Sequence, residues 1–309
     1  MKDRMSHAIS FSSVRKTFGE VTALDGLDFV APSGAVTVLL GPNGAGKTTT
    51  VRLTTGAMIH DSGEIRVLGL DPLTDGDEVR ARVGVVPPKP AFYDQLSGWE
   101  NLKFAATIFK ADEAQAREAA VRFAIDDVLD QDVGGYSTGM RTRLALARAV
   151  LHDPEVLLLD EPTAGLDPES ARAVLDLISE MAERGRTIVM CTHLLHEAEG
   201  IADQVILIED GQVRASGDPK TLVDQYMADP TVIIDAEDRT MLRIIAELDG
   251  VLSVRDEGAF RVVLDSTDRI PDIVIELVKR GVRPTRIDPL RPTLEDLYFE
   301  MQRAHREAR

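Results

Sequence analysis

The fold of the chain is decided by the stretch VTVLLGPNGAGKT, which occupies residues 36–48. Its opening part, Val36 to Leu40, is apolar or β-branched and predicts a short buried strand. The rest fits the pattern G-x-x-x-x-G-K-[ST] in its strand-to-helix position. Glycines let the backbone curl so that successive N–H groups point to one centre, and the following helix adds its positive end. The stretch therefore predicts a phosphate-binding loop, or P-loop.

The residues of this loop have distinct expected roles. Lys47 supplies a positive charge to the β- and γ-phosphates, and the Thr48 hydroxyl is a ligand for Mg²⁺. A flexible glycine-rich turn is disfavoured, because a chance match is on the order of 1% from average glycine usage. The expected nucleotide contacts are Gly41, Pro42, Asn43, Gly44, Ala45, Gly46, Lys47, Thr48 and Thr49.

An acidic pair, Asp160-Glu161, directly follows the apolar run Val156–Leu159. Both carboxylates should emerge at a carboxyl end of the sheet, where open α/β folds bind their ligands. Asp160 suits Mg²⁺, and Glu161, pointing differently, can orient or deprotonate the water that attacks the γ-phosphate. Such a pair alone is more often a helix cap or a solvated turn. Together with the P-loop it predicts a hydrolytic site.

The pattern from about residue 8 to 220 predicts an α/β domain with a mostly parallel sheet, because short apolar runs alternate with helical stretches. Residues 9–30 indicate a small antiparallel sheet, and residues 92–150 an inserted helical subdomain. This first domain is expected to span residues 1–228. Its clearest predicted strands are Val36–Leu40, Val83–Val86, Val156–Leu159, Thr187–Cys191 and Val205–Glu209.

A second domain is predicted over residues 229–309, after the break at Asp229-Pro230. From Thr231 the pattern is strand, helix, strand, strand, helix and strand, followed by a last helix from Leu294. The first of these helices is expected at Arg239–Leu248. This order resembles an α+β ferredoxin-like unit with an appended helix.

Composition excludes several classes of protein. The net charge of −17 argues against a nucleic-acid partner, because a polyphosphate calls for a basic surface. No stretch approaches the roughly 18–20 apolar residues needed to cross a bilayer, and the first residues lack the apolar core of a signal peptide. We therefore expect a cytosolic location. The single cysteine, Cys191, is expected to be a small buried hydrophobic residue.

The segment Tyr136–Ala149, YSTGMRTRLALARA, resembles the signature motif of ATP-binding-cassette (ABC) ATPases. Ser137 and Gly139 precede a helix with an apolar face, and free N–H groups at a helix N-terminus make an anion site. An isolated Ser-x-Gly is usually an ordinary helix cap, but this one lies shortly before the acidic-pair strand. The resemblance implies a P-loop NTPase core that binds ATP, with Ser137, Thr138 and Gly139 contacting the nucleotide.

Other parts of the ABC pattern follow in order, so that the resemblance covers roughly residues 8–225. Thr163–Asp167 looks like the D-loop, which implies a nucleotide contact by Asp167. His193 looks like the switch histidine that senses the γ-phosphate, and Phe18 matches the aromatic residue that stacks on adenine. Taken alone, Phe18 would be a core aromatic and His193 a structural histidine.

One position departs from the pattern. After the strand Val83–Val86 the family places a glutamine that reaches Mg²⁺ and the attacking water, whereas this chain has Pro88. The helical insert also looks a few residues short before Tyr136. These differences bear on the efficiency of hydrolysis and on the link to a partner.

The end of the chain, residues 291–299, looks like the closing helix of the accessory domain in ABC-2 type exporter ATPases, the group of daunorubicin-resistance exporters. The resemblance implies two ATPase subunits, identical or homologous, that sandwich ATP between the P-loop of one and the signature of the other. It implies a separate membrane permease, with the chain at the cytoplasmic face of the membrane and a drug, antibiotic or lipid-like molecule exported. The alternatives are a soluble ABC protein acting on ribosomes or in DNA repair, and a regulatory nucleotide-binding module with little turnover.

Overall fold

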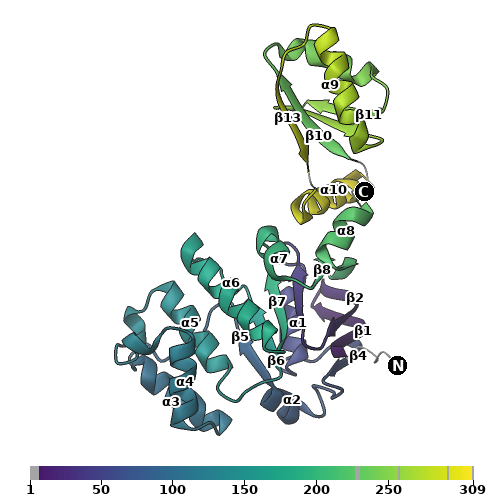
Figure 1. The fold of residues 1–309 in the computed structure, drawn as a ribbon. Coiled ribbons are helices and arrows are strands. Elements are labelled where there is room, and N and C mark those ends of the chain that lie inside the picture. Colours follow the sequence, from purple (N-terminus) through teal and green to yellow (C-terminus); the bar gives the residue numbers. More distant parts are fainter. Residues whose placement is uncertain (1–6, 227–229, 257, 291, 308–309) are drawn as a thin grey trace, which may run out of the picture. The chain divides into compact units, whose positions relative to one another are not determined.

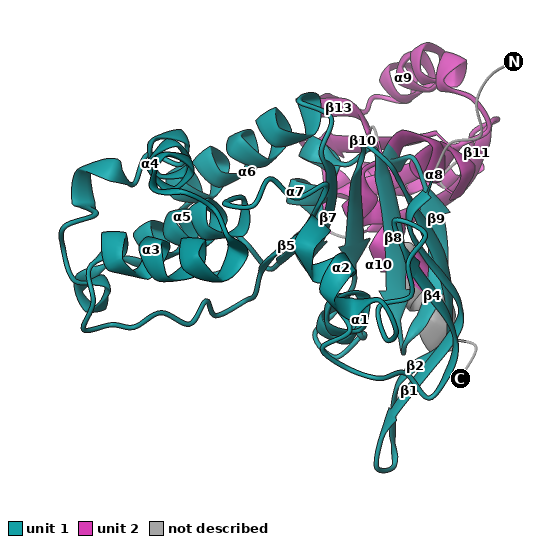
Figure 2. Cartoon of the chain, turned by 90° about the horizontal axis from the view of Figure 1, so that it is seen from below, with its two compact units in different colours: residues 1–219 teal, residues 220–309 magenta. Residues whose placement is uncertain are grey.

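The computed structural model of the chain describes residues 7–226, 230–256, 258–290 and 292–307. The chain divides into two units, Met1–Pro219 and Lys220–Arg309, which Figure 2 shows in different colours. The predicted boundary between residues 228 and 229 lies outside the described residues and stays a prediction. No helix in the described ranges is long and apolar enough to cross a membrane.

A six-stranded sheet forms the centre of the first unit (Figure 1). Its order is β5-β6-β7-β3-β8-β9, in which all neighbours are parallel except β8 and β9. Both β3 and β6 are buried along their whole length, as expected of strands covered on both faces. The five predicted strands are confirmed: β3 Val36–Leu40, β5 Val83–Val86, β6 Val156–Asp160, β7 Thr187–Thr192 and β8 Gln204–Glu209, with β9 Gln212–Gly217 added at the edge.

The predicted antiparallel sheet is confirmed and has a third strand. It has the order β2-β1-β4, with β1 His7–Phe18, β2 Val21–Pro32 and β4 Ser62–Val67. Strand β4 was not predicted, because only Ile65 and Val67 alternate as buried apolar residues within it. Its pairing with β1 supplies what its own pattern lacks.

The inserted helical subdomain contains α3 Gly98–Phe109, α4 Glu113–Arg122 and α5 Thr138–Ala149. Figures 1 and 2 both show these helices on the opposite side of the first unit from β1, β2 and β4. Ser97 and Asp112 begin α3 and α4 with capping boxes, each side chain accepting the N–H three residues on. The described part of this unit also contains α1 Lys47–Thr54, α2 Gly76–Arg82, α6 Pro168–Glu183 and α7 Leu195–Ile201, with two short 3₁₀ helices, η1 Asp126–Val128 and η2 Val133–Gly135, between α4 and α5.

The second unit has a core of its own around a four-stranded sheet of order β11-β12-β10-β13, with antiparallel neighbours throughout. The helix predicted over Arg239–Leu248 is a 3₁₀ helix, η3, at Arg239–Glu247. Among the described residues the remaining elements are β10 Thr231–Ala236, β11 Val251–Asp256, β12 Phe260–Leu264, η4 Thr267–Arg269, α9 Ile270–Lys279, β13 Pro284–Leu290 and α10 Leu294–Glu307. Helix α8, Pro219–Tyr226, begins at the division between the units.

Replacing Ser97 with Ala should loosen the start of α3. The Ser97 hydroxyl accepts the Glu100 N–H at 3.2 Å, and loss of such a cap costs about 1 kcal/mol. Hydrogen–deuterium exchange of the first turn of α3 should therefore become about fivefold faster. Ser97→Thr keeps an accepting hydroxyl and serves as the control. Equal exchange rates in Ser97→Ala and Ser97→Thr would contradict the assigned cap.

Candidate active site

The P-loop leaves β3 at Leu40 and enters α1 at Lys47. Its first residue must be glycine, because a Cβ on Gly41 would lie 2.1 Å from the carbonyl oxygen of Ile208 in β8. No side chain caps the start of α1 among the described residues, so its first N–H groups are available to an anion. The loop has the geometry of a phosphate cradle.

The last glycine of the loop fixes it against the antiparallel sheet. Gly46 has a left-handed φ of 108°, and a Cβ there would lie 2.5 Å from the Leu24 side chain and 2.8 Å from the Ala23 carbonyl oxygen of β2. Leu24 pairs across the sheet with Lys16 of β1, two residues before Phe18. This pairing places the end of β1 near the P-loop.

Phe18 is 47% exposed, so the reading as a core aromatic is wrong. It pairs with Val21 at the tip of the β1–β2 hairpin. The Lys16 ammonium lies 5.4 Å from the centre of its ring. An exposed ring beside a phosphate cradle is available for stacking on a base, and a nearby cation reinforces such a surface.

Lys47 lies inside the loop that it follows. Its ammonium donates to the carbonyl oxygens of Gly41 at 2.7 Å and Pro42 at 3.2 Å. The same nitrogen is 3.5 Å from Oε1 of Glu161. The positive charge thus stands between the P-loop and the end of β6, where a phosphate held by the loop would meet it.

Asp160 is the last residue of β6 and is 1% exposed. Neither of its carboxylate oxygens has a hydrogen-bond partner within the described part of the chain. Burial raises its pKa, and the neighbouring Thr48 hydroxyl acts in the opposite direction. A buried carboxylate with both oxygens unpaired is unfavourable by itself. Together with the neighbouring Thr48 hydroxyl, the Asp160 carboxylate matches the oxygen ligands that Mg²⁺ prefers.

Glu161 turns away from Asp160 because its backbone is left-handed, with a φ of 53°. Its N–H donates to the Cys191 carbonyl oxygen at 2.9 Å, which anchors this strained residue to β7. Its carboxylate is 2.8 Å from Nδ1 of His193. Strain of this kind typically costs about 1–3 kcal/mol and is held only where the surroundings enforce it. Cys191 is fully buried, as expected.

The signature residues lie apart from these groups and form the start of α5. The Ser137 hydroxyl caps this helix by accepting the Met140 N–H at 3.2 Å. Asp167 caps α6 and accepts the N–H groups of Glu169 and Ser170, and the bonds from Ser170 lower the pKa of Asp167. The hydrogen bonds and ion pairs of the described residues include none between this segment and the P-loop.

Thr138 and Gly139 instead lie close to residues of the D-loop and α6. A Cβ on Gly165 would be 3.9 Å from the Thr138 methyl group, and one on Gly139 would be 3.6 Å from the Ser170 hydroxyl. A cavity of about 230 Å³ is lined by Thr138, Glu161 and the loop residues Pro88, Lys89 and Pro90 among others. Pro88, which stands where a glutamine was expected, therefore borders the same cavity as Glu161.

The chain is similar to known proteins of one family. The family model of the ABC transporter matches residues 24–164. A daunorubicin resistance ATP-binding protein of Streptomyces coeruleorubidus is 35% identical over 96% of this chain and 95% of its own length. The chain belongs to the ABC transporter ATP-binding proteins. Members of this family hydrolyse ATP to energise transport, and this chain is an ATPase subunit of that kind.

Other relatives of this ABC ATPase extend the comparison. A Nod factor export ATP-binding protein I of Paraburkholderia xenovorans is 38% identical over 84% of this chain and 87% of its own length. A solved ATP-binding subunit of an ABC transporter has a TM-score of 0.65 and 27% identity, covering 71% of this chain and 93% of its own. The structure of cbiO1 from Clostridium perfringens, part of the ABC transporter complex cbiONQ, has a TM-score of 0.63 and 26% identity, covering 78% and 96%.

Two contacts of the ABC ATPase site were missed in the sequence. Lys16 lies two residues before Phe18 on β1, so the period of a strand could have indicated that both side chains share a face. The hydrogen bond from Glu161 to the Cys191 carbonyl had no such signal, because backbone carbonyls carry no sequence information. It depends only on the pairing of β6 with β7.

Replacing Asp160 with Asn should raise the melting temperature of the nucleotide-free, Mg²⁺-free ABC ATPase. Burial raises the pKa of Asp160 above its ordinary 3.8, so the folded chain holds this proton more tightly than the unfolded chain. Its ionisation therefore destabilises the fold increasingly as the pH rises through that interval. At pH 7.5 the substitution should add about 2–4 °C, the shift expected for about 1 kcal/mol.

The stabilisation by Asp160→Asn should shrink as the pH falls towards 3.8 and vanish well below that value, where the carboxyl group is protonated in both states. Asp167→Asn is the control, because the pKa of this exposed aspartate is lowered by its hydrogen bonds and its substitution should give no gain. Differential scanning calorimetry at several pH values measures both. A melting temperature of Asp160→Asn at or below that of the native chain at pH 7.5 would contradict the assigned burial cost.

Proposed function

We propose that this ABC ATPase energises an exporter, bound to a separate permease at the cytoplasmic face of the cell membrane. The observation that carries the proposal is the extent of the match to a daunorubicin resistance ATP-binding protein, which covers 96% of the chain and so includes most of the second unit. A second relative is named for Nod factor export. The exported molecule is a drug, an antibiotic or a lipid-like compound. A soluble, non-transport ABC protein is disfavoured by these relatives.

In the proposed mechanism the P-loop holds the phosphates of ATP. The N–H groups of Gly41 to Thr49 and the Lys47 ammonium bind the β- and γ-phosphates, while adenine stacks on Phe18. The exposed ring of Phe18 and the absence of a capping side chain at α1, within the described residues, support these roles. Thr48 and Asp160 hold Mg²⁺, which neutralises charge on the phosphates when bound.

Glu161 acts as the general base in this mechanism and orients the water that attacks the γ-phosphate. Its carboxylate lies between Lys47 and His193, at 3.5 Å and 2.8 Å from the two nitrogens. Both contacts keep the carboxylate in one position, and His193 is near enough to respond to a γ-phosphate bound at Lys47. A general base in such a position contributes about 10²–10⁴ to the rate.

A second copy, or a homologous subunit, completes each site. Ser137, Thr138, Gly139 and Asp167 bind the ATP held by the P-loop of the partner subunit. Support for the signature residues comes from their position at the start of α5, where the helix dipole favours an anion. The second unit is assigned as a ferredoxin-like accessory domain on the basis of its strand order, β11-β12-β10-β13.

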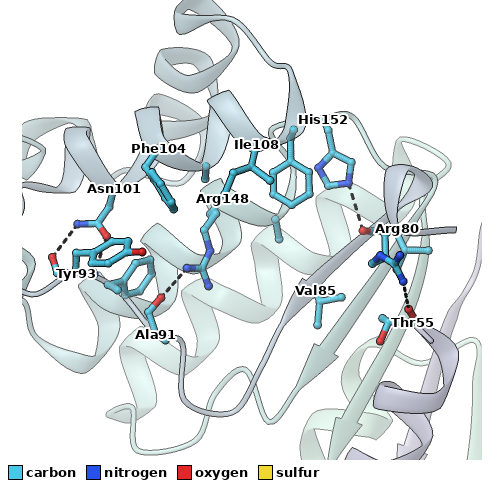
Figure 3. A pocket seen from close by; sticks show the side chains of 15 residues that line it. Thr55, Arg80, Val85, Ala91, Tyr93, Asn101, Phe104, Ile108, Arg148 and His152 are labelled. Atoms are coloured by element: carbon cyan, nitrogen blue, oxygen red, sulfur yellow. Dashed lines mark hydrogen bonds between the residues drawn. The ribbon is translucent and has the colours of Figure 1, made fainter. Parts of the chain in front are cut away.

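The permease contacts the first unit at an apolar groove of about 700 Å³ (Figure 3), between α3 and the end of α5 on one side and β5 and the loop after it on the other. Tyr93, Phe104 and Ile108 line this groove and are 53%, 50% and 61% exposed. Exposed apolar side chains gathered in one hollow indicate an interaction surface. The loop that carries Pro88 continues into the groove at Ala91, which links the groove to the cavity beside Glu161.

The catalytic roles are tested with two substitutions. Glu161→Gln should keep ATP binding, lose turnover by about 10²-fold or more, and form dimers with Mg-ATP, because only water activation is removed. Lys47→Ala should lose tight ATP binding, because phosphate contacts of the ground state are removed. Nucleotide binding, phosphate release and size-exclusion chromatography measure the three properties. Turnover of Glu161→Gln within about threefold of the native chain, or no dimer with or without permease, would contradict the assignment.

Pro88 is expected to weaken the coupling of hydrolysis to the permease. Proline offers neither a side-chain acceptor nor a backbone N–H, so it cannot report the state of the site as a glutamine would. Pro88→Gln should therefore hydrolyse ATP faster or depend more strongly on the permease. Pro90→Gln, in the same loop and cavity, is the control. ATPase rates in lipid, with and without permease, decide the question: equal rates and stimulation in Pro88→Gln and the native chain would show that this position is neutral.

A further inference from the structure

The groove of Figure 3 has an unusual charge for this chain. Arg80, Arg148 and His152 line it, and no aspartate or glutamate does. The whole sequence has 52 acidic and only 35 basic residues, with a net charge of −17. A hollow that combines exposed aromatic rings with basic side chains, and has no carboxylate in its lining, is complementary to a partner that is apolar and acidic.

Two of these three side chains, Arg80 and His152, already have partners within the chain. Arg80 forms an ion pair with Asp77 and donates to the Thr55 carbonyl oxygen at 3.3 Å. The His152 ring stacks on Phe109 at 4.2 Å and contacts the Val83 carbonyl oxygen. Burial lowers the pKa of His152, so its ring is neutral at pH 7.

Arg148 differs from them. Figure 3 shows its side chain reaching into the groove, where Nη1 donates to the Ala91 carbonyl oxygen at 2.7 Å. Its guanidinium lies 4.5 Å from the centre of the Phe92 ring. No carboxylate of the described residues forms an ion pair with it, and burial lowers its pKa. One carbonyl and one ring leave most of its five N–H donors without an anionic acceptor.

An arginine in this situation favours an incoming carboxylate. The guanidinium has already lost much of its hydration and its orientation is fixed by Ala91 and Phe92, so a planar carboxylate can be bound in a bidentate manner at little further cost. The exposed rings of Tyr93 and Phe104, whose centres lie 5.3 Å apart, would meet apolar side chains of the same segment. Filling the groove would exclude water and strengthen the pair.

We propose that the permease segment that enters this groove is an apolar segment with one aspartate or glutamate, and that this carboxylate pairs with Arg148. The proposal rests on the proposed function, which supplies the permease as partner. Arg148 lies in the last turn of α5, and the signature residues lie at the other end of the same helix. The carboxylate therefore binds a helix that reaches directly to the shared ATP site.

The test uses the full chain and the permease that co-purifies with it, reconstituted in lipid nanodiscs. Arg148→Gln should bind the permease about tenfold more weakly or worse, as expected for removal of one member of a desolvated charge pair. Arg148→Glu should bind more weakly still, and Arg148→Lys should recover part of the loss. The readout is permease binding and not the ATPase rate, because Arg148 also holds the loop that borders the cavity beside Glu161.

Arg117→Gln is the matched control. Arg117 lies in the same helical subdomain and also stacks on an aromatic ring, 4.2 Å from the centre of Trp99, but it does not line the groove. The Arg117→Gln variant should bind the permease as tightly as the native chain does. A second measurement is charge-swap rescue, in which one cytoplasmic aspartate or glutamate of the permease, changed to arginine, restores binding to Arg148→Glu.

The outcomes separate the two proposals. If the native chain binds no permease, the proposed function fails, and the assignment of the carboxylate fails with it. If the native chain binds but Arg148→Gln binds as tightly as Arg117→Gln, only the assignment of the carboxylate is overturned. The assignment of the carboxylate is also overturned if no cytoplasmic aspartate or glutamate of the permease, changed to arginine, restores binding to Arg148→Glu, whatever the folding yield of the Arg148 variants.

Discussion

Parallel pairing of β3 with β7, and of β7 with β6, brings the carboxyl ends of three strands to one edge of the sheet. The P-loop follows the first strand, His193 the second and Glu161 the third. Lys47 and Glu161, 114 positions apart, thereby come within 3.5 Å, and Glu161 and His193, 32 positions apart, come within 2.8 Å. The contacts of Glu161 with Lys47 and His193 depend on this register. A shift by one residue would turn alternate side chains to the other face and dismantle the site.

The site is assembled from groups that are unfavourable for the fold alone. Asp160 is buried with both oxygens unpaired, and Glu161 has a left-handed backbone. The surrounding structure enforces both, through the buried strand β6 and the bond from Glu161 to the Cys191 carbonyl. This combination is typical of functional sites, where polar groups are held ready for a ligand at the expense of stability.

The loop after β5 connects two regions with different chemistry. At Pro88 it borders the cavity beside Glu161, and from Ala91 to Tyr93 it borders the apolar groove. The guanidinium of Arg148 holds this loop by its bond to Ala91 and its stacking on Phe92. A partner bound in the groove would therefore act on the same loop that lies next to the catalytic carboxylate. A stiff proline at its start limits which hydrogen bonds could carry that effect.

The sequence by itself determined the P-loop, the acidic pair, the signature and the buried strands, because each depends on neighbouring residues and on a period of two or on fixed glycine spacing. Tertiary structure alone decided that Phe18 is exposed beside the P-loop, that β4 joins the antiparallel sheet and that Glu161 contacts Lys47 and His193. It also decided that side chains from positions as far apart as Thr55 and His152 line one apolar groove that contains Arg148. The physical reason is that these features arise from pairing and packing between distant segments, and the residues of one segment carry no record of which other segment covers them.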